Sequence, residues 1–138
     1  MPFADLPDDV RLHYRFDGEA DAPPLLLSNS LGTDLAMWEP QMPALSAHFR
    51  VLRYDTRGHG QSSVPPGPYS IAQLGRDVVA LLDRPGLDRV DFAGVSMGGM
   101  TGMWLGVNLP ERIAKLALAN TAARIAPPAL WNGRIDKV

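Results

Sequence analysis

A serine between two glycines, in the stretch Gly-Val-Ser-Met-Gly at residues 94–98, is the part of this sequence best suited to chemistry. It follows the apolar run at 90–95 and precedes residues 97–109, where apolar side chains recur at helical spacing until Pro110. A sharp turn from strand to helix exposes a serine hydroxyl at the carboxyl end of the strand, and small flanking residues let the two elements approach closely. Ser96 is therefore predicted to be a nucleophile for acyl transfer, with Gly94 and Gly98 as its small neighbours.

The same turn predicts a site that stabilises negative charge. The first N–H groups of a helix have no partner within the helix, and they favour an anion at its amino end. We therefore expect the N–H of Met97 to be one donor of an oxyanion hole. The G-x-S-x-G pattern is weak on its own in a chain with 13 glycines. The assignment depends on the strand, turn and helix that are predicted around it.

A serine nucleophile needs a base, and histidine is the usual one. The three histidines, His13, His48 and His59, all precede Ser96 in the sequence. His13 lies on the polar side of an alternating strand at 10–16, so it is expected to be exposed to solvent. His48 is expected to cap or solvate a helix end, and His59, between two glycines, to have a structural role. None of them is predicted to be the base.

Alternating strands and helices are predicted to position these residues. Strands are expected at 10–16, 25–27, 49–54, 90–95 and 113–119, and those at 25–27 and 113–119 are apolar enough to be buried. Helices are expected over 34–45 with an irregularity at two prolines, over 71–82 with Ser70 as its N-cap, and over 97–109. After the strand at 49–54, Asp55 and Arg57 are expected to form a structural network that fixes the loop. This order predicts an α/β fold with a mostly parallel sheet and helices on both faces.

Composition narrows the class of partner. The chain has 138 residues, of which 46% are hydrophobic and 20% charged, and its net charge is −2, so it lacks the basic field that nucleic acid or anionic membrane requires. Cysteine is absent, which excludes disulfides and thiolate metal sites. No signal peptide or membrane span is recognisable, so a cytoplasmic location is expected. We expect a small-molecule substrate, no metal and no cofactor; the sequence leaves the oligomeric state open.

Four blocks of sequence resemble one family. They are Ser-Asn-Ser-Leu-Gly-Thr-Asp-Leu-Ala-Met-Trp at 28–38, Arg-Tyr-Asp-Thr-Arg-Gly-His-Gly at 53–60, Gly-Val-Ser-Met-Gly-Gly at 94–99 and Ala-Asn-Thr-Ala-Ala-Arg-Ile at 119–125. In this order they look like the 3-oxoadipate enol-lactonases of the α/β-hydrolase fold. Four blocks in order are more specific than the serine turn alone.

The resemblance implies a substrate, a mechanism and a second oxyanion donor. Such enzymes open the lactone ring of 3-oxoadipate enol-lactone to 3-oxoadipate in bacterial aromatic catabolism, through an acyl-enzyme on the serine, here Ser96. The first oxyanion donor is the residue after the nucleophile, Met97. Many relatives have His-Gly before the second donor; this chain has Asn29 and Ser30 there, so the donor falls on Leu31.

The resemblance also implies that the chain is incomplete. In the α/β-hydrolase fold the triad acid and histidine follow the serine in later loops, and this sequence contains neither region. Residues 1–126 are therefore expected to be the amino-terminal part of the core, truncated before the distal strands, and 127–138 the incomplete start of a cap. Without the base, the 138 residues alone are expected to be inactive.

Two arginines near the expected cap bear on substrate recognition. The substrate carboxylate needs a cationic partner, which Arg124 or Arg134, near Trp131, could supply. An ordinary surface role is favoured for both.

Two alternatives to the enol-lactonase function remain. The fold also serves hydrolases of esters, thioesters and carbon–carbon bonds. A non-catalytic or truncated module would also explain why no histidine follows Ser96.

Overall fold

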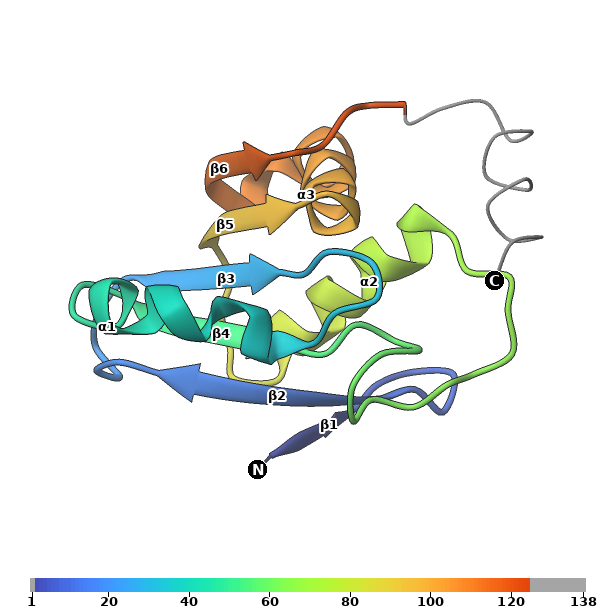
Figure 1. The fold of residues 1–138 in the computed structure, drawn as a ribbon, viewed down its shortest axis with the longest axis horizontal. Helices are drawn as coiled ribbons and strands as arrows, with labels where there is room; N and C mark the ends of the chain where they lie inside the picture. Colours follow the sequence, from blue (N-terminus) through green and yellow to red (C-terminus); the bar gives the residue numbers. More distant parts are fainter. Residues whose placement is uncertain (1, 125–138) are drawn as a thin grey trace.

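A computed structural model describes residues 2–124 as an open twisted sheet with helices packed against it (Figure 1). Its strands are β1 (Phe3–Asp5), β2 (Arg11–Asp17), β3 (Pro24–Ser28), β4 (Arg50–Tyr54), β5 (Val90–Val95) and β6 (Ile113–Ala119). Its helices are η1 (Leu35–Gln41), α1 (Met42–Leu45), α2 (Ile71–Asp83), α3 (Met97–Asn108) and η2 (Pro110–Arg112), where η marks a 3₁₀ helix. Each strand and main helix predicted from the sequence is present within a few residues of its expected bounds.

The sheet in this part of the chain has the order β1-β2-β4-β3-β5-β6. Strands β4, β3, β5 and β6 run parallel, whereas β2 is antiparallel to both β1 and β4. The mostly parallel sheet is therefore confirmed. The carboxyl ends of parallel strands lie on the same side of the sheet, so the loops after β3, β4 and β5 gather there. Ligands bind at this side in open α/β sheets.

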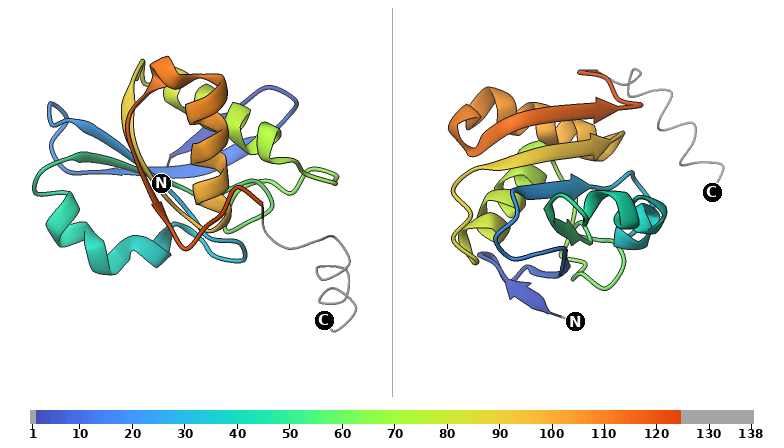
Figure 2. Two further views of the ribbon diagram at one scale, coloured as in Figure 1. Left: turned by 90° about the horizontal axis from the view of Figure 1, so that it is seen from above. Right: turned by 90° about the vertical axis from the view of Figure 1, so that its left-hand side faces the viewer.

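Helices cover both faces of the sheet, as predicted. Figure 2 shows α2 and α3 on one face and the η1–α1 segment on the other. Alternate side chains of β3 enter the two cores, because successive residues of a strand point to opposite faces. Leu26 belongs to the cluster that α2 and α3 cover, and Leu25 and Leu27 pack with Trp38 and Met42 on the other side.

Local signals set the helix boundaries. Ser70 caps α2 as predicted: its Oγ accepts from the N–H of Gln73, whose side chain accepts from the N–H of Ser70. Asp34 caps η1 by accepting from the N–H of Ala36. Pro40 lacks an N–H and lies inside η1, which explains why this segment is a 3₁₀ helix followed by a short α-helix.

One prediction about the sheet was wrong. The apolar run of β6 was expected to be a buried strand, but only Ile113 is buried and the following six residues are exposed. The strand is the outermost strand of the sheet in the described part of the chain, so no neighbouring strand covers its outer edge there. Leu116 and Leu118 are consequently 38% and 42% exposed.

Candidate active site

The turn at Ser96 has the backbone of a nucleophile elbow. Ser96 lies between β5 and α3 with φ 54° and ψ −114°, a conformation that a residue with a side chain adopts only under strain. Three hydrogen bonds hold it in place. Its N–H donates to the carbonyl of Ala119 at 3.0 Å, and its carbonyl accepts from Thr121 Oγ1 at 2.8 Å and from the N–H of Met100 at 3.1 Å. The end of β6 therefore fixes the turn.

The two glycines that flank the serine are required by close packing. A Cβ on Gly94 would lie 2.3 Å from the carbonyl oxygen of Gly98, so the turn has no room for a side chain there. A Cβ on Gly98 would lie 2.1 Å from the carbonyl oxygen of Ser28. The first turn of α3 thus sits directly against the end of β3, which brings the serine turn beside the loop that follows β3.

The strand register places two candidate oxyanion donors on the same edge. Ser28 of β3 pairs with Gly94 of β5, so Leu31 and Met97, each three residues further along, follow neighbouring strands. Leu31 is 57% exposed. Neither its N–H nor that of Met97, the first residue of α3, has a hydrogen-bond partner within residues 2–124. Both groups therefore keep their capacity to donate.

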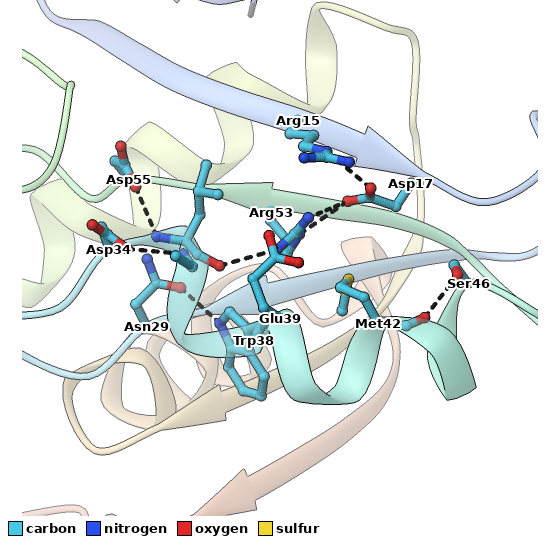
Figure 3. Close-up of polar contacts among 12 residues, drawn as sticks. Arg15, Asp17, Asn29, Asp34, Trp38, Glu39, Met42, Ser46, Arg53 and Asp55 are labelled. Atoms are coloured by element: carbon cyan, nitrogen blue, oxygen red, sulfur yellow. Dashed lines mark hydrogen bonds and ion pairs between the residues drawn. The ribbon is translucent and has the colours of Figure 1, made fainter.

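Polar side chains fix the loop after β3 and the start of η1 (Figure 3). Asn29 is buried; its amide donates to the carbonyl of Tyr54 at 2.7 Å and its Oδ1 accepts from Trp38 Nε1 at 2.7 Å. Buried Arg53 ties η1, which follows the loop, to β2: it donates to the carbonyl of Leu35 and to Glu39 on η1, and to Asp17 on β2. Burial lowers the pKa of Arg53, but its hydrogen bonds to these two carboxylates outweigh that effect and raise the pKa above its usual value.

Asp55 is the hub between the loops after β3 and β4. Its carboxylate accepts from the N–H of Leu35 at 2.8 Å, from the N–H of Gln61 at 2.9 Å, and pairs with His13 Nδ1 at 2.8 Å. The expectation that His13 is exposed was therefore wrong: the residue is 1% exposed. The loop after β4 covers the polar side of β2 at His13. The N–H of His13 donates to Ser62 Oγ in this loop, and its carbonyl accepts from the N–H of Asp55.

Arg57 takes part in a separate buried pair. Its guanidinium donates through Nε and Nη2 to both carboxylate oxygens of Asp77 on α2, each at 2.7 Å. These hydrogen bonds raise the pKa of Arg57 above its usual value. Asp55 and Arg57 thus both fix the loop, as predicted, but through different partners.

The other two histidines are also placed. His48 is exposed and precedes β4, so it lies at the sheet edge opposite the serine turn. His59 is half-buried, and its ring contacts the backbone of Arg57 and of Gly32. A cavity of about 460 Å³ opens between residues 32–37 and 58–60. Within residues 2–124, no hydrogen bond joins any of the three histidines to Ser96.

Several expected features fall at or beyond the limit of the described residues. Arg124 is exposed, whereas Trp131, Arg134 and the predicted cap segment 127–138 lie outside the described residues. Between residues 2 and 124 no cluster of three metal-ligating side chains is found. None of the helices described is long and apolar enough to cross a membrane.

Sequence comparison identifies the family. Residues 23–134 of the chain match the family model for the alpha/beta hydrolase fold. The chain belongs to the α/β-hydrolase fold family. It is 50% identical over 130 residues to 3-oxoadipate enol-lactonase 2 of Acinetobacter baylyi, a match that covers 94% of this chain and 49% of that protein.

Structural comparison points to the same family. The enol-lactonase of Burkholderia xenovorans LB400 superposes with a TM-score of 0.94 at 55% identity, covering 99% of this chain and 53% of the other. A thermophilic esterase from Thermogutta terrifontis superposes with a TM-score of 0.89 at 28% identity, covering 97% and 51%. The chain thus spans about half the length of the relatives it matches. The α/β-hydrolase fold that the resemblance of the four sequence blocks implied is confirmed.

Proposed function

We propose that Ser96 is the nucleophile of a serine hydrolase that opens the lactone ring of 3-oxoadipate enol-lactone. The strained backbone of Ser96, held at the carboxyl edge of the sheet, is the observation that carries this proposal. Such strain persists where the surrounding structure enforces it, and here three hydrogen bonds and two obligatory glycines do so. The choice of lactone rests on the similarity to two enol-lactonases at 50% and 55% identity.

The reaction would proceed through an acyl-enzyme. Ser96 Oγ attacks the ring carbonyl while a base takes its proton, and the carbonyl oxygen becomes an oxyanion that accepts from the N–H groups of Met97 and Leu31. Collapse breaks the bond to the ring oxygen, which leaves as an enol and becomes a ketone. The product stays attached as an ester of Ser96 until water attacks and releases the carboxylate.

The base and the acid would come from residues beyond position 138. In this fold the acid and the histidine follow the serine, and the histidines of this chain are otherwise engaged or distant. His13 is buried against Asp55, and His48 lies at the opposite edge of the sheet. We accordingly propose that the 138 residues alone are inactive, because a serine without its base is a weak nucleophile at neutral pH.

A completed chimera tests the nucleophile. Residues 1–138 are joined to the part of the Burkholderia xenovorans enol-lactonase that lies beyond the match, and a fluorophosphonate probe is applied. We expect labelling of the chimera, almost none of the 138-residue chain, and none of the chimera with Ser96→Ala. An unlabelled chimera that folds and melts cooperatively would favour the non-catalytic module.

A proline at position 31 tests the second oxyanion donor, because proline lacks the N–H itself. In the chimera, Leu31→Pro should lower kcat for the enol-lactone by about a hundredfold or more with little change in KM. Leu31→Ala keeps the N–H and is the matched control. Equal kcat values for the two variants would remove Leu31 from the oxyanion hole.

Ester hydrolysis is the second candidate function. The esterase from Thermogutta terrifontis favours it, because that protein shares the fold of this chain at 28% identity. The chimera is compared on the enol-lactone and on an uncharged aryl ester. If kcat/KM is higher for the aryl ester than for the enol-lactone, the proposed substrate class becomes simple esters.

A further inference from the structure

The loop after β4 presents His59 on a rigid support. The N–H of His59 donates to the carbonyl of Thr56 at 2.9 Å, and its own carbonyl accepts from the N–H of Ser62 at 3.0 Å. The glycines on both sides, Gly58 and Gly60, have φ of 78° and 52°, which favour glycine. A side chain on Gly60 would also collide with the carboxylate of Asp55. The histidine ring therefore projects from a loop that is fixed on both sides of it.

The two contacts of the ring define its protonation state. The N–H of Gly32 donates to His59 Nε2 at 3.0 Å, so Nε2 must be the unprotonated nitrogen. Nδ1 then carries the proton and donates to the carbonyl of Arg57 at 3.1 Å. Only the neutral Nδ1–H tautomer satisfies both contacts at once.

These contacts act on the peptides around Leu31. The carbonyl of Ser30, which shares a peptide plane with the N–H of Leu31, accepts from Thr33 through Oγ1 at 2.7 Å and through N–H at 3.3 Å. The next peptide is held through the N–H of Gly32 by His59. Gly32 has φ 76°, and apart from its chain neighbours no atom lies within 4 Å of where its Cβ would be, so this side of the residue is open. The hydrogen bond that the Gly32 N–H donates to His59 Nε2 ties this peptide to the loop after β4.

We propose that His59 is a positioning residue that fixes the Leu31–Gly32 peptide and so aims the N–H of Leu31 at the oxyanion. This inference rests on the proposed function, because Leu31 acts as a donor only during acyl transfer. His59 touches neither substrate nor reacting atoms in this role. It acts as a hydrogen-bond acceptor for the backbone of the loop, which explains why a ring nitrogen rather than an ammonium or a hydrocarbon suits this position.

The hydrogen bond itself is tested on the 138-residue chain, independently of activity. Nitrogen chemical shifts of the His59 ring should report the Nδ1–H tautomer. Amide exchange of Gly32 should accelerate at least about tenfold in His59→Leu, because its acceptor is gone. His59→Gln, whose side-chain oxygen reaches about as far as Nε2, should restore protection, and His48→Leu should not change it. The opposite tautomer, or unchanged exchange in His59→Leu, would overturn the proposal.

The positioning role is tested in the chimera with the enol-lactone. We expect His59→Leu to lower kcat by about ten- to a hundredfold with KM nearly unchanged, since a small misplacement of a donor costs rate rather than binding. His59→Gln should recover most of kcat, and His48→Leu should match the parent. A parent chimera without activity would contradict the proposed function. An active parent with an equally active His59→Leu would contradict only the positioning role.

Discussion

Replacing Gly98 with alanine should force the start of α3 away from β3. The new Cβ would lie 2.1 Å from the carbonyl oxygen of Ser28 and 2.4 Å from its carbonyl carbon. Such contacts essentially never fall below 3.0 Å, so the helix and the strand would have to open by at least about 0.9 Å. Both contacts are to backbone, so no side chain can rotate to make room.

The cost follows from overpacking and is partly offset by helix propensity. Forcing extra volume into a close-packed contact costs about 1–3 kcal/mol, and a backbone clash belongs at the upper end. Alanine is better than glycine inside a helix by about 1 kcal/mol. The free energy of unfolding should therefore fall by about 2 kcal/mol, or about 8 °C in Tm for a domain of this size.

Gly106 provides the matched control in the same helix. A Cβ there would meet only Leu116 Cδ2 at 3.5 Å, an ordinary contact, so Gly106→Ala should raise the free energy of unfolding by about 0.5–1 kcal/mol. Urea denaturation of the 138-residue chain, followed by circular dichroism, measures both variants. The reasoning fails if Gly98→Ala is as stable as the parent, or if the two variants are destabilised equally.

Three further predictions concern stability. Ser96→Gly should raise the free energy of unfolding by about 1 kcal/mol by relieving the φ of 54°, while abolishing fluorophosphonate labelling of the chimera; a less stable variant would contradict the strain. Arg57→Met should cost about 3 kcal/mol or more in urea denaturation because buried Asp77 loses its partner, and a loss below about 1 kcal/mol would argue against burial of the pair. Burial raises the pKa of the Tyr54 hydroxyl from 10.0 to about 12. The neutral hydroxyl therefore contributes about 3 kcal/mol to the free energy of unfolding below pH 10, and this contribution is lost as pH rises towards 12. Tyr54→Phe should flatten that part of the stability profile relative to the parent, and an unchanged slope would refute the assignment.

The serine turn and the order of strands could be predicted because their signals are local. The small residues around Ser96, the apolar strand before it and the helical spacing after it all lie within 20 residues. Ser70 was identified as a cap for the same reason, since a capping side chain bonds to a residue only three positions away. Local rules decide these features, and tertiary packing does not overrule them.

The environment of His13 could not be predicted, because it depends on a contact 42 residues away. The alternation of polar and apolar residues placed His13 on the solvent side of β2. The loop after β4 covers that side instead and supplies Asp55 as its partner. A polar residue is buried when it is paired, and the pairing partner is not visible from the strand itself. The partner of Arg57 on α2 was missed for the same reason.

The pairing of Ser28 with Gly94 has a consequence for how the protein folds. These residues are 66 positions apart in the sequence, and their strands must close that loop before the two candidate oxyanion donors can meet. Long-range pairing of parallel strands is slow because the entropy of loop closure is lost before contacts compensate for it. A one-residue slip would also turn every side chain of β3 to the opposite face. The hydrogen bonds of the serine turn span at most 25 residues, so we expect the turn to form before the two oxyanion donors meet.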